Sequence, residues 1–358
     1  MKSARTVSSR PVVVLTHRVH DEVKQLLSTE CRVVSNDSAE SWTPAELLHH
    51  SREADALMVF MPDSLDEHLL GQCPNLKVVS AALKGYDNFD VEACARRGVW
   101  FTIVPDLLTQ PTAELALGLT LGITRNVLPG DRLVRSGNYQ GWRPVLYGGG
   151  LNGQAVGIVG MGKVGQAFAR LLAGFDTTIF YSDKNRLSAG DEGRLRANRV
   201  DLDRLLSVSN VLVLLVPLQN GTLHLIDRSA LRQMKAGSYL VNVGRGSVAD
   251  EEAVADALAT GHLAGYAADV FEMEDWARPD HPRAISPRLL GAANTLFTPH
   301  LGSAVDSVRL QIELAAARNI LQALNGQEPT DAINQPQPQE PAVAADERRA
   351  TMSGQNYQ

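Results

Sequence analysis

The glycine-rich segment at residues 160–165, Gly-Met-Gly-Lys-Val-Gly, constrains the fold of this chain more than any other, because it directly follows the apolar run 155–159. Glycine has no Cβ, so its backbone can approach a phosphate closely, and a helix that starts there directs its positive end at the same group. A second apolar run, 177–181, leads to Asp183, whose carboxylate can accept hydrogen bonds from the hydroxyls of an adenosine ribose. Strand, glycine turn, helix and acid together predict a βαβ unit that binds NAD.

Two cations follow the acidic residue and widen the prediction for the cofactor. Lys184 and Arg186 could interact with a 2′-phosphate, which the Asp183 carboxylate would repel. We therefore expect NAD as the main cofactor and NADP as a secondary one.

Composition excludes several classes of protein. The 358 residues suffice for about two domains, and a net charge of −6 implies no general affinity for nucleic acid. Cys31, Cys73 and Cys94 have neither metal-site nor disulfide spacing, which favours reduced thiols in a cytoplasmic protein. No apolar run reaches membrane-spanning length, residues 1–10 are too polar for a signal peptide, and no metal site is expected.

Short apolar runs alternate with helical segments along the chain, and this pattern predicts an α/β fold with parallel sheets. We expect strands at 12–16, 56–60, 77–81, 211–216, 238–243, 265–270 and 295–298. Helices are expected at 21–27, 65–70, 112–123 and 304–324. Residues 1–10 are expected to be flexible, and residues 334–358, rich in Pro, Gln and Ala, to be disordered.

Three polar segments, 244–247, 268–274 and 298–303, each follow a predicted strand, so they should meet at one edge of the sheet. Arg245 in the first can hold an anion through two parallel hydrogen bonds. His300 in the third can act as a base near neutral pH, and Glu274 in the second can orient its ring. Each residue alone is compatible with a surface loop, but the three together predict a catalytic site.

These motifs, in this order, resemble the D-isomer-specific 2-hydroxyacid dehydrogenases over about residues 11–333. The resemblance implies two Rossmann-like, doubly wound parallel-sheet domains, with the NAD-binding domain (109–300) inserted into a substrate domain (11–108 and 301–333). It implies a homodimer in which Arg245, Glu274 and His300 are catalytic. It also implies that Asp269 faces the nicotinamide carboxamide. The implied cofactor-binding residues are Gly160, Gly162, Lys163, Val164, Gly165, Asp183, Leu215, Val216, Pro217, Val243, Asp269, Gly302 and Thr112.

The loop at residues 82–90 departs from that family's usual pattern, because it carries Lys84 where small or apolar residues are typical. A 2-hydroxy acid has one negative charge, which Arg245 already matches. A second cation suits a substrate that carries two charges. The alternative is that Lys84 points outward into solvent.

Segments 16–22, 60–63, 104–109 and 265–278 further resemble the phosphite (phosphonate) dehydrogenases, a group within the family. This resemblance implies NAD-dependent oxidation of phosphite to phosphate. The implied substrate-binding residues are Lys84, Arg245, His300, Ser303, Met61, Trp142 and Tyr147. Two alternatives stay open: a D-2-hydroxyacid dehydrogenase that reduces 2-keto acids, and a non-catalytic NAD(H)-sensing corepressor.

Overall fold

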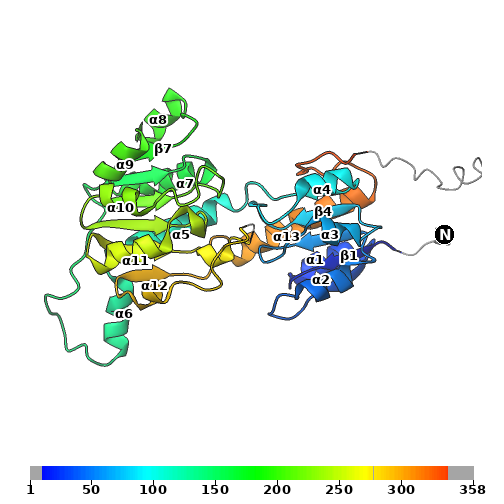
Figure 1. Ribbon diagram of the computed structural model, residues 1–358, viewed down its shortest axis with the longest axis horizontal. Coiled ribbons are helices and arrows are strands. Elements are labelled where there is room, and N and C mark those ends of the chain that lie inside the picture. The colour runs from blue at the N-terminus through cyan, green and yellow to red at the C-terminus, as the bar shows by residue number, and fades with distance from the viewer. Residues whose placement is uncertain (1–9, 277, 338–358) are drawn as a thin grey trace, which may run out of the picture.

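The computed structural model describes residues 10–276 and 278–337, which form two α/β lobes joined by a narrow waist (Figure 1). The sheet of the first lobe has five parallel strands in the order β2-β1-β3-β4-β5. Its strands are β1 (Val12–Leu15), β2 (Arg32–Ser35), β3 (Ala56–Val59), β4 (Val78–Ala81) and β5 (Trp100–Thr102). The helices of this lobe are α1 (Asp21–Ser28), α2 (Pro44–Ser51), α3 (Glu67–Gly71), α4 (Val91–Arg96) and α13 (Asp306–Leu324).

The sheet of the second lobe has seven parallel strands in the order β12-β11-β10-β9-β6-β7-β8. They are β6 (Ala155–Val159), β7 (Thr178–Ser182), β8 (Ala197–Arg199), β9 (Val211–Leu214), β10 (Ser238–Asn242), β11 (Leu263–Ala268) and β12 (Thr295–Phe297). The helices are α5 (Thr109–Thr124), α6 (Val127–Arg135), α7 (Lys163–Leu171), α8 (Ala189–Leu195), α9 (Leu202–Val208), α10 (Arg228–Gln233), α11 (Glu251–Ala259) and α12 (Pro287–Gly291). The described residues of this lobe also form three short 3-10 turns: η1 (Leu172–Gly174), η2 (Gly246–Val248) and η3 (Glu272–Glu274).

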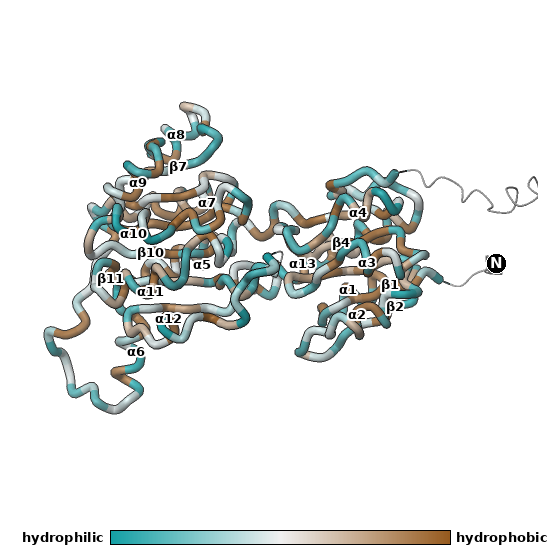
Figure 2. The backbone as a smooth tube through the Cα atoms, in the orientation of Figure 1, coloured by the Kyte–Doolittle hydropathy of each residue, from teal (hydrophilic) through white to brown (hydrophobic). Residues whose placement is uncertain are grey.

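Both faces of each sheet are covered, which explains why the strands are continuous apolar runs. In β9, Val211 and Val213 pack into the core on one face of the sheet, whereas Leu212 and Leu214 pack into the core on the other. The same division holds in β3, where Leu57 and Val59 face one core and Ala56 and Met58 the other. Figure 2 shows these apolar strands as brown segments inside both lobes.

The strand order places ligand sites where the two lobes face each other. In the second sheet the chain runs outward in both directions from β6 and β9, so the turn after β6 lies at the switch point. The chain enters this lobe through α5 and returns through α13, which packs against α1, β3 and β4 of the first lobe. The predicted fold class, two parallel-sheet α/β domains, is confirmed.

One prediction about the C-terminal segment is wrong for its first residues. Asn334, expected to be disordered, accepts a hydrogen bond from Phe101 N at 2.7 Å and donates one to Val99 O at 2.9 Å. Gln337 N donates to Ala95 O at 2.8 Å. Asn334 therefore packs beside β5, because its amide satisfies the edge of that strand, and Gln337 binds the last turn of α4. The rest of the predicted tail, and residues 1–9 of the predicted flexible start, lie outside the described residues.

The described residues include no helix that is both long and apolar enough to cross a membrane. Within the same ranges, no three His, Cys, Asp or Glu side chains are grouped so that they could hold a metal ion. The three cysteines are free and buried. Burial raises the pKa of the Cys31 and Cys73 thiols to about 11 and that of Cys94 to about 12, so all three stay protonated near neutral pH.

Candidate active site

The turn between β6 and α7 has the shape that a dinucleotide pyrophosphate requires. Gly160 has φ +95°, and a Cβ on it would lie 2.7 Å from Val216 Cγ1. A Cβ on Gly165 would lie 2.2 Å from Gly160 O, so α7 can pack closely on the turn only with glycine there. Gly162, the N-cap of α7, has no neighbouring atom within 4 Å of its Cβ position. This open space in front of the helix N-terminus fits the cofactor predicted from the motif.

Asp183 lies at the end of β7 and braces this turn. Its Oδ2 accepts a hydrogen bond from Met161 N at 2.7 Å, and its Oδ1 accepts one from Asn185 N at 2.8 Å. The carboxylate is thus held beside the glycine turn, where the ribose of a bound dinucleotide is recognised in this fold.

The cations around Asp183 differ from those that the sequence suggested. Arg186 is bound by Glu192, with both contacts at 3.1 Å. Arg199, at the end of β8, instead donates to Asp183 O at 2.9 Å, and sequence reasoning missed it because β8 was not predicted. Lys184 stays in this region and donates to Gln219 Oε1 at 3.0 Å.

Other predicted cofactor residues follow neighbouring strands at the same edge: Leu215, Val216 and Pro217 after β9, Val243 after β10, and Asp269 after β11. Thr112 of α5 donates to Gly302 O at 3.2 Å, so these two predicted residues lie together.

Asp269 holds the turn that carries His300. Its Oδ1 accepts hydrogen bonds from Thr298 Oγ1 and Leu301 N, both at 2.6 Å, and its Oδ2 accepts one from Gly302 N at 2.9 Å. Burial raises the pKa of this carboxyl, while these hydrogen bonds lower it. Asp269 therefore sets the conformation of residues 298–302.

His300 and Glu274 form the predicted pair. His300 Nδ1 lies 2.5 Å from Glu274 Oε2, and Glu274 Oε1 accepts a hydrogen bond from Phe271 N at 3.1 Å. His300 has φ +56°, which is a strained backbone conformation. A hydrogen bond from His300 N to Asp269 O, at 2.9 Å, helps to hold it. Because Nδ1 faces the carboxylate, Nε2 is left to take a proton from a reactant.

Arg245 reaches across to the loop of the first lobe that carries Lys84. Its Nη2 lies 3.3 Å from Asp87 Oδ1, and a Cβ on Gly85 would lie only 1.7 Å from the same Nη2. The guanidinium therefore lies directly against the Gly85 backbone. Its Nε is buried and has no hydrogen-bond partner among the described residues, as expected of a group that awaits a ligand.

Lys84, next to Gly85, is half-buried, and in the part of the chain that the structure describes its ammonium makes no hydrogen bond. Burial lowers its pKa, as does the nearby charge of Lys163, whereas Asp106 raises it. Asp106 itself forms an ion pair with Lys163 of the glycine turn at 2.5 Å. Lys84 is therefore a half-buried cation in the same loop as Gly85, against which Arg245 lies.

The remaining predicted substrate residues fall into two groups. Met61 follows β3, where its carbonyl accepts a hydrogen bond from Asn88 at 2.8 Å, and Ser303 follows the His300 turn. Trp142 and Tyr147 are not brought to this site by their own chain. They are 81% and 75% exposed on the segment that runs from α6 along the far side of the second lobe (Figure 1).

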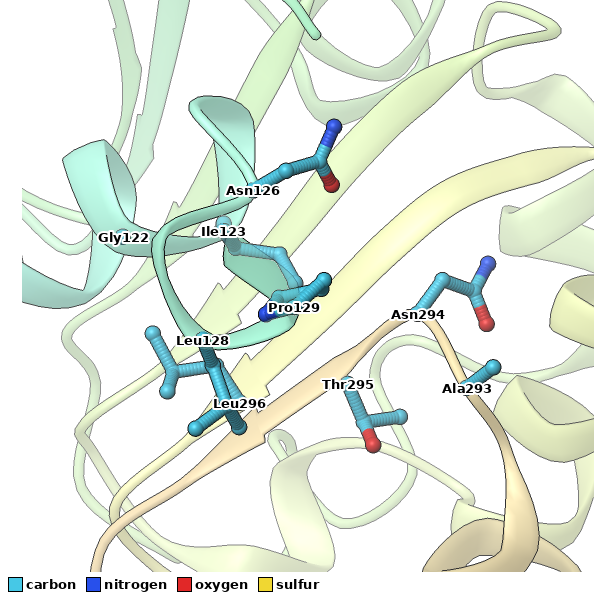
Figure 3. A pocket seen from close by; sticks show the side chains of 9 residues that line it. All are labelled: Gly122, Ile123, Asn126, Leu128, Pro129, Ala293, Asn294, Thr295 and Leu296. Atoms are coloured by element: carbon cyan, nitrogen blue, oxygen red, sulfur yellow. The ribbon is translucent and has the colours of Figure 1, made fainter. Parts of the chain in front are cut away.

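A small pocket at the start of that segment contains none of the predicted site residues. It lies between the end of α5, the start of α6 and β12, and Figure 3 shows Asn126 and Asn294 at its two sides. The catalytic candidates lie instead in the region between the lobes. The pocket is lined by Gly122, Ile123, Asn126, Leu128, Pro129, Ala293, Asn294, Thr295 and Leu296.

A pair of buried acids lies directly behind the Glu274 turn. Glu251 N donates to Glu272 Oε1 at 3.0 Å, and Glu272 N donates to Glu251 Oε1 at 2.8 Å. Glu251 is only 4% exposed. Burial, together with the nearby charge of Glu272, raises its pKa from 4.5 to about 7.

We expect Glu251→Gln to change how stability depends on pH. A carboxyl whose pKa is raised on folding favours the folded state below pH 4.5 and loses that contribution as pH rises through about 7. From about pH 5 to about pH 8, the free energy of unfolding of the variant should therefore rise by about 1–3 kcal/mol relative to the unmodified protein. Urea denaturation at both pH values measures this. Glu252→Gln, at an exposed neighbour, is the control, and a pH-independent difference for Glu251→Gln would contradict the prediction.

Comparison with known proteins identifies a matching family and similar proteins. Residues 117–302 match the family described as D-isomer specific 2-hydroxyacid dehydrogenase, NAD binding domain. A glyoxylate reductase from Thermofilum pendens is 36% identical over 330 residues, which cover 91% of this chain and 95% of the relative. The matched residues include the glycine turn, Arg245, Glu274 and His300.

Two solved structures with a similar fold are also named as reductases. A glyoxylate reductase from Paecilomyes thermophila has a TM-score of 0.79 and 25% identity, covering 91% of this chain and 99% of that chain. An NADPH-dependent glyoxylate/hydroxypyruvate reductase from Sinorhizobium meliloti, in complex with NADP and malonate, has a TM-score of 0.76 and 27% identity, covering 91% and 97%.

Proposed function

The chain belongs to the D-isomer specific 2-hydroxyacid dehydrogenase family, and we propose that within it the protein oxidises phosphite to phosphate with NAD+ as the hydride acceptor. The family and the NAD(H) cofactor predicted from the motifs are confirmed. The proposal of phosphite is supported by one observation: Lys84 is half-buried and directly precedes Gly85, and the Arg245 guanidinium lies against the Gly85 backbone, so we propose that both cations bind one substrate. Phosphite is largely dianionic near neutral pH, whereas a 2-keto acid carries one charge.

The second candidate is reduction of a 2-keto acid such as glyoxylate. It is favoured by the relatives, which are named glyoxylate reductases, and it would use the same Arg245, Glu274 and His300. A third possibility, a corepressor that senses NAD(H), would need the cofactor site but no turnover.

The catalytic residues suit the proposed reaction as follows. Lys84 and Arg245 neutralise the substrate and aim its P–H bond at the cofactor site. Because the reactants are already aligned, less entropy is lost on the way to the transition state, and the activation barrier is lower. His300 Nε2 takes a proton from water while the water oxygen forms a bond to phosphorus, and Glu274 stabilises the imidazolium that results. Arg245 also stabilises the charge that develops on the phosphorus oxygens.

The atoms and electrons balance in this scheme. The P–H bond breaks with its electron pair, a P–O bond to water forms, and phosphite plus NAD+ and water gives phosphate, NADH and a proton. NAD+ bound at the glycine turn supplies the acceptor for the hydride. Closure of the two lobes would exclude bulk water from the reactants.

The test measures NADH formation with phosphite and NAD+, and phosphate by phosphorus NMR, beside NADH consumption with glyoxylate and with hydroxypyruvate. We expect the highest kcat/KM with phosphite. No turnover of phosphite together with reduction of a keto acid would establish the second candidate. Binding of NADH with no turnover of any of these acids would favour the corepressor.

NADP+ is proposed as a secondary cofactor, because Arg199 and Lys184 flank Asp183 and could offer cations to a 2′-phosphate. We expect Arg199→Ala to weaken NADP+ binding about 5- to 10-fold relative to NAD+, since a charge-assisted hydrogen bond to phosphate is lost. Titration calorimetry with each cofactor gives the two Kd values. Arg186→Ala is the matched control, because Glu192 holds that guanidinium away. Equal weakening of both cofactors would place Arg199 outside the 2′-phosphate site.

A homodimer is also proposed. No residue of α6 is buried, and the segment after it exposes several large apolar side chains. Contiguous exposed apolar groups of this kind usually mark an interface. A second copy that covers this segment would also be the source of Trp142 and Tyr147 for the substrate site. Light scattering should give twice the chain mass of 38.7 kDa, and a monomer at working concentration would contradict the proposal. The exposed apolar residues are Val127, Val134, Tyr139, Trp142, Val145, Leu146 and Tyr147.

A further inference from the structure

The turn that carries Arg245 and the turn that carries Glu274 are in direct backbone contact. A Cβ on Gly246, the first residue of η2, would lie 1.9 Å from Phe271 C and 2.2 Å from Glu272 N. Only glycine allows the two turns to approach this closely. A displacement of either turn must therefore displace the other.

Ser247 is the point at which polar groups fasten the Arg245 turn. Its backbone N–H donates to Asp275 Oδ2 at 2.7 Å, and its Oγ accepts a hydrogen bond from Arg278 Nη1 at 2.7 Å. Ser247 is fully buried and Asp275 is 1% exposed, so water does not compete for these bonds. Ser247, two positions after Arg245, is thus held by hydrogen bonds to the segment that follows Glu274.

Arg278 completes the connection to the Glu274 turn. The same Nη1 donates to Glu272 Oε2 at 3.0 Å, and His224 Nε2 lies 3.0 Å from that oxygen. Arg278 Nη2 donates to Asp280 at 3.2 Å, which holds the guanidinium plane in place. The Arg278 side chain is only 15% exposed. One guanidinium nitrogen therefore joins η2 to η3.

We propose that Arg278 is a positioning residue that fixes Arg245 relative to the Glu274–His300 pair. Its side chain binds Ser247, Glu272 and Asp280, none of which is assigned to the substrate or the cofactor, so it acts through the two turns. The inference rests on the catalytic roles proposed for Arg245 and Glu274, whichever anion is the substrate. Arg245, which binds the anion, and His300, which acts as the base, must hold fixed positions relative to each other so that hydride loss and water attack can occur in one arrangement of atoms.

The test compares Arg278→Ala, Arg278→Lys and Ser247→Ala. A catalytic group misplaced by about 1 Å can lose about 100-fold in rate, so we expect Arg278→Ala to lower kcat/KM about 10- to 100-fold. Both kcat and KM should change, because both turns lose their fastening. Ser247→Ala should mainly raise KM, because it removes only the contact between Arg278 and the Arg245 turn and keeps the backbone hydrogen bond to Asp275. Arg278→Lys should recover part of the loss, and guanidinium added to Arg278→Ala should recover part of kcat.

Arg288→Ala is the matched control, because Arg288 of α12 also bridges two acids, Glu252 and Asp256, at the surface of the same lobe. Thermal unfolding and the Kd for NADH are measured for every variant. Arg278→Ala that melts at a lower temperature but keeps the original kcat and KM would overturn the proposal, as would equal losses in Arg288→Ala. All assays use phosphite and glyoxylate in parallel. Failure of phosphite turnover in the unmodified protein would then overturn the proposed substrate and leave the role of Arg278 measurable with glyoxylate.

Discussion

Replacing His300 by Asn is expected to lower kcat about 10²- to 10⁴-fold, because the reaction loses the general base that we propose for it. Asn can keep a hydrogen bond toward Glu274 but cannot take a proton at the position of Nε2. The KM for the substrate and the Kd for NADH should change little, since Arg245 and the glycine turn remain. Steady-state kinetics and a separate NADH titration distinguish the two effects.

Two further variants complete this test. Glu274→Gln should lower kcat less than His300→Asn does, because the ring keeps its base but loses the carboxylate 2.5 Å from Nδ1. His68→Asn, at an exposed position of α3 in the first lobe, controls for loss of a histidine as such. A His300→Asn enzyme with undiminished kcat would show that another group accepts the proton.

Replacing Lys84 by Met is expected to raise the KM for phosphite about 10- to 100-fold, since a charged hydrogen bond of about 1.5–3 kcal/mol is lost. Methionine keeps much of the volume of the lysine stem and removes the charge. The KM for glyoxylate should rise much less, because Arg245 alone matches a single carboxylate. The ratio of the two effects measures how far Lys84 selects a doubly charged substrate.

Lys77→Met is the matched control for that substitution, because Lys77 is an exposed lysine of the same lobe, directly before β4. Equal increases in KM for phosphite and glyoxylate would show that Lys84 supports the loop rather than recognising the second charge. An unchanged KM for phosphite would place Lys84 outside the site.

Local patterns predicted part of the geometry of the candidate site. The glycine turn follows from residues adjacent in the chain, and Gly160 and Gly165 have the close contacts that its motif implies. Arg245, Glu274 and His300 could be ordered on one edge because the carboxyl ends of parallel strands meet there. The His300–Glu274 contact at 2.5 Å is what that order predicted.

Features that depend on tertiary contacts could not be predicted in this way. Arg199 was missed because β8 has only three residues and little apolar character. Arg186 was assigned to the cofactor because nothing local reveals its ion pair with Glu192. The link from Ser247 to Arg278 joins residues 31 positions apart, so no motif contains it.

The segment after α6 shows a different limit. The family resemblance implies that Trp142 and Tyr147 bind the substrate, but it does not say which copy of the chain supplies them. The same composition that suggested disorder after residue 334 also gave no sign of the hydrogen bonds between Asn334 and β5.

The path of α13 and of the residues after it has a consequence for biosynthesis. The first lobe needs α13 against β3 and β4, and Asn334 beside β5, so its core stays open until residue 334 has left the ribosome. The second lobe, by contrast, is continuous in the chain from α5 to β12. Because domains tend to fold as units during synthesis, the nucleotide-binding lobe can fold first, while the nascent residues 12–102 wait with apolar strands exposed. Chaperones that shield β1 to β5 during this interval would therefore act on the lobe that carries Lys84.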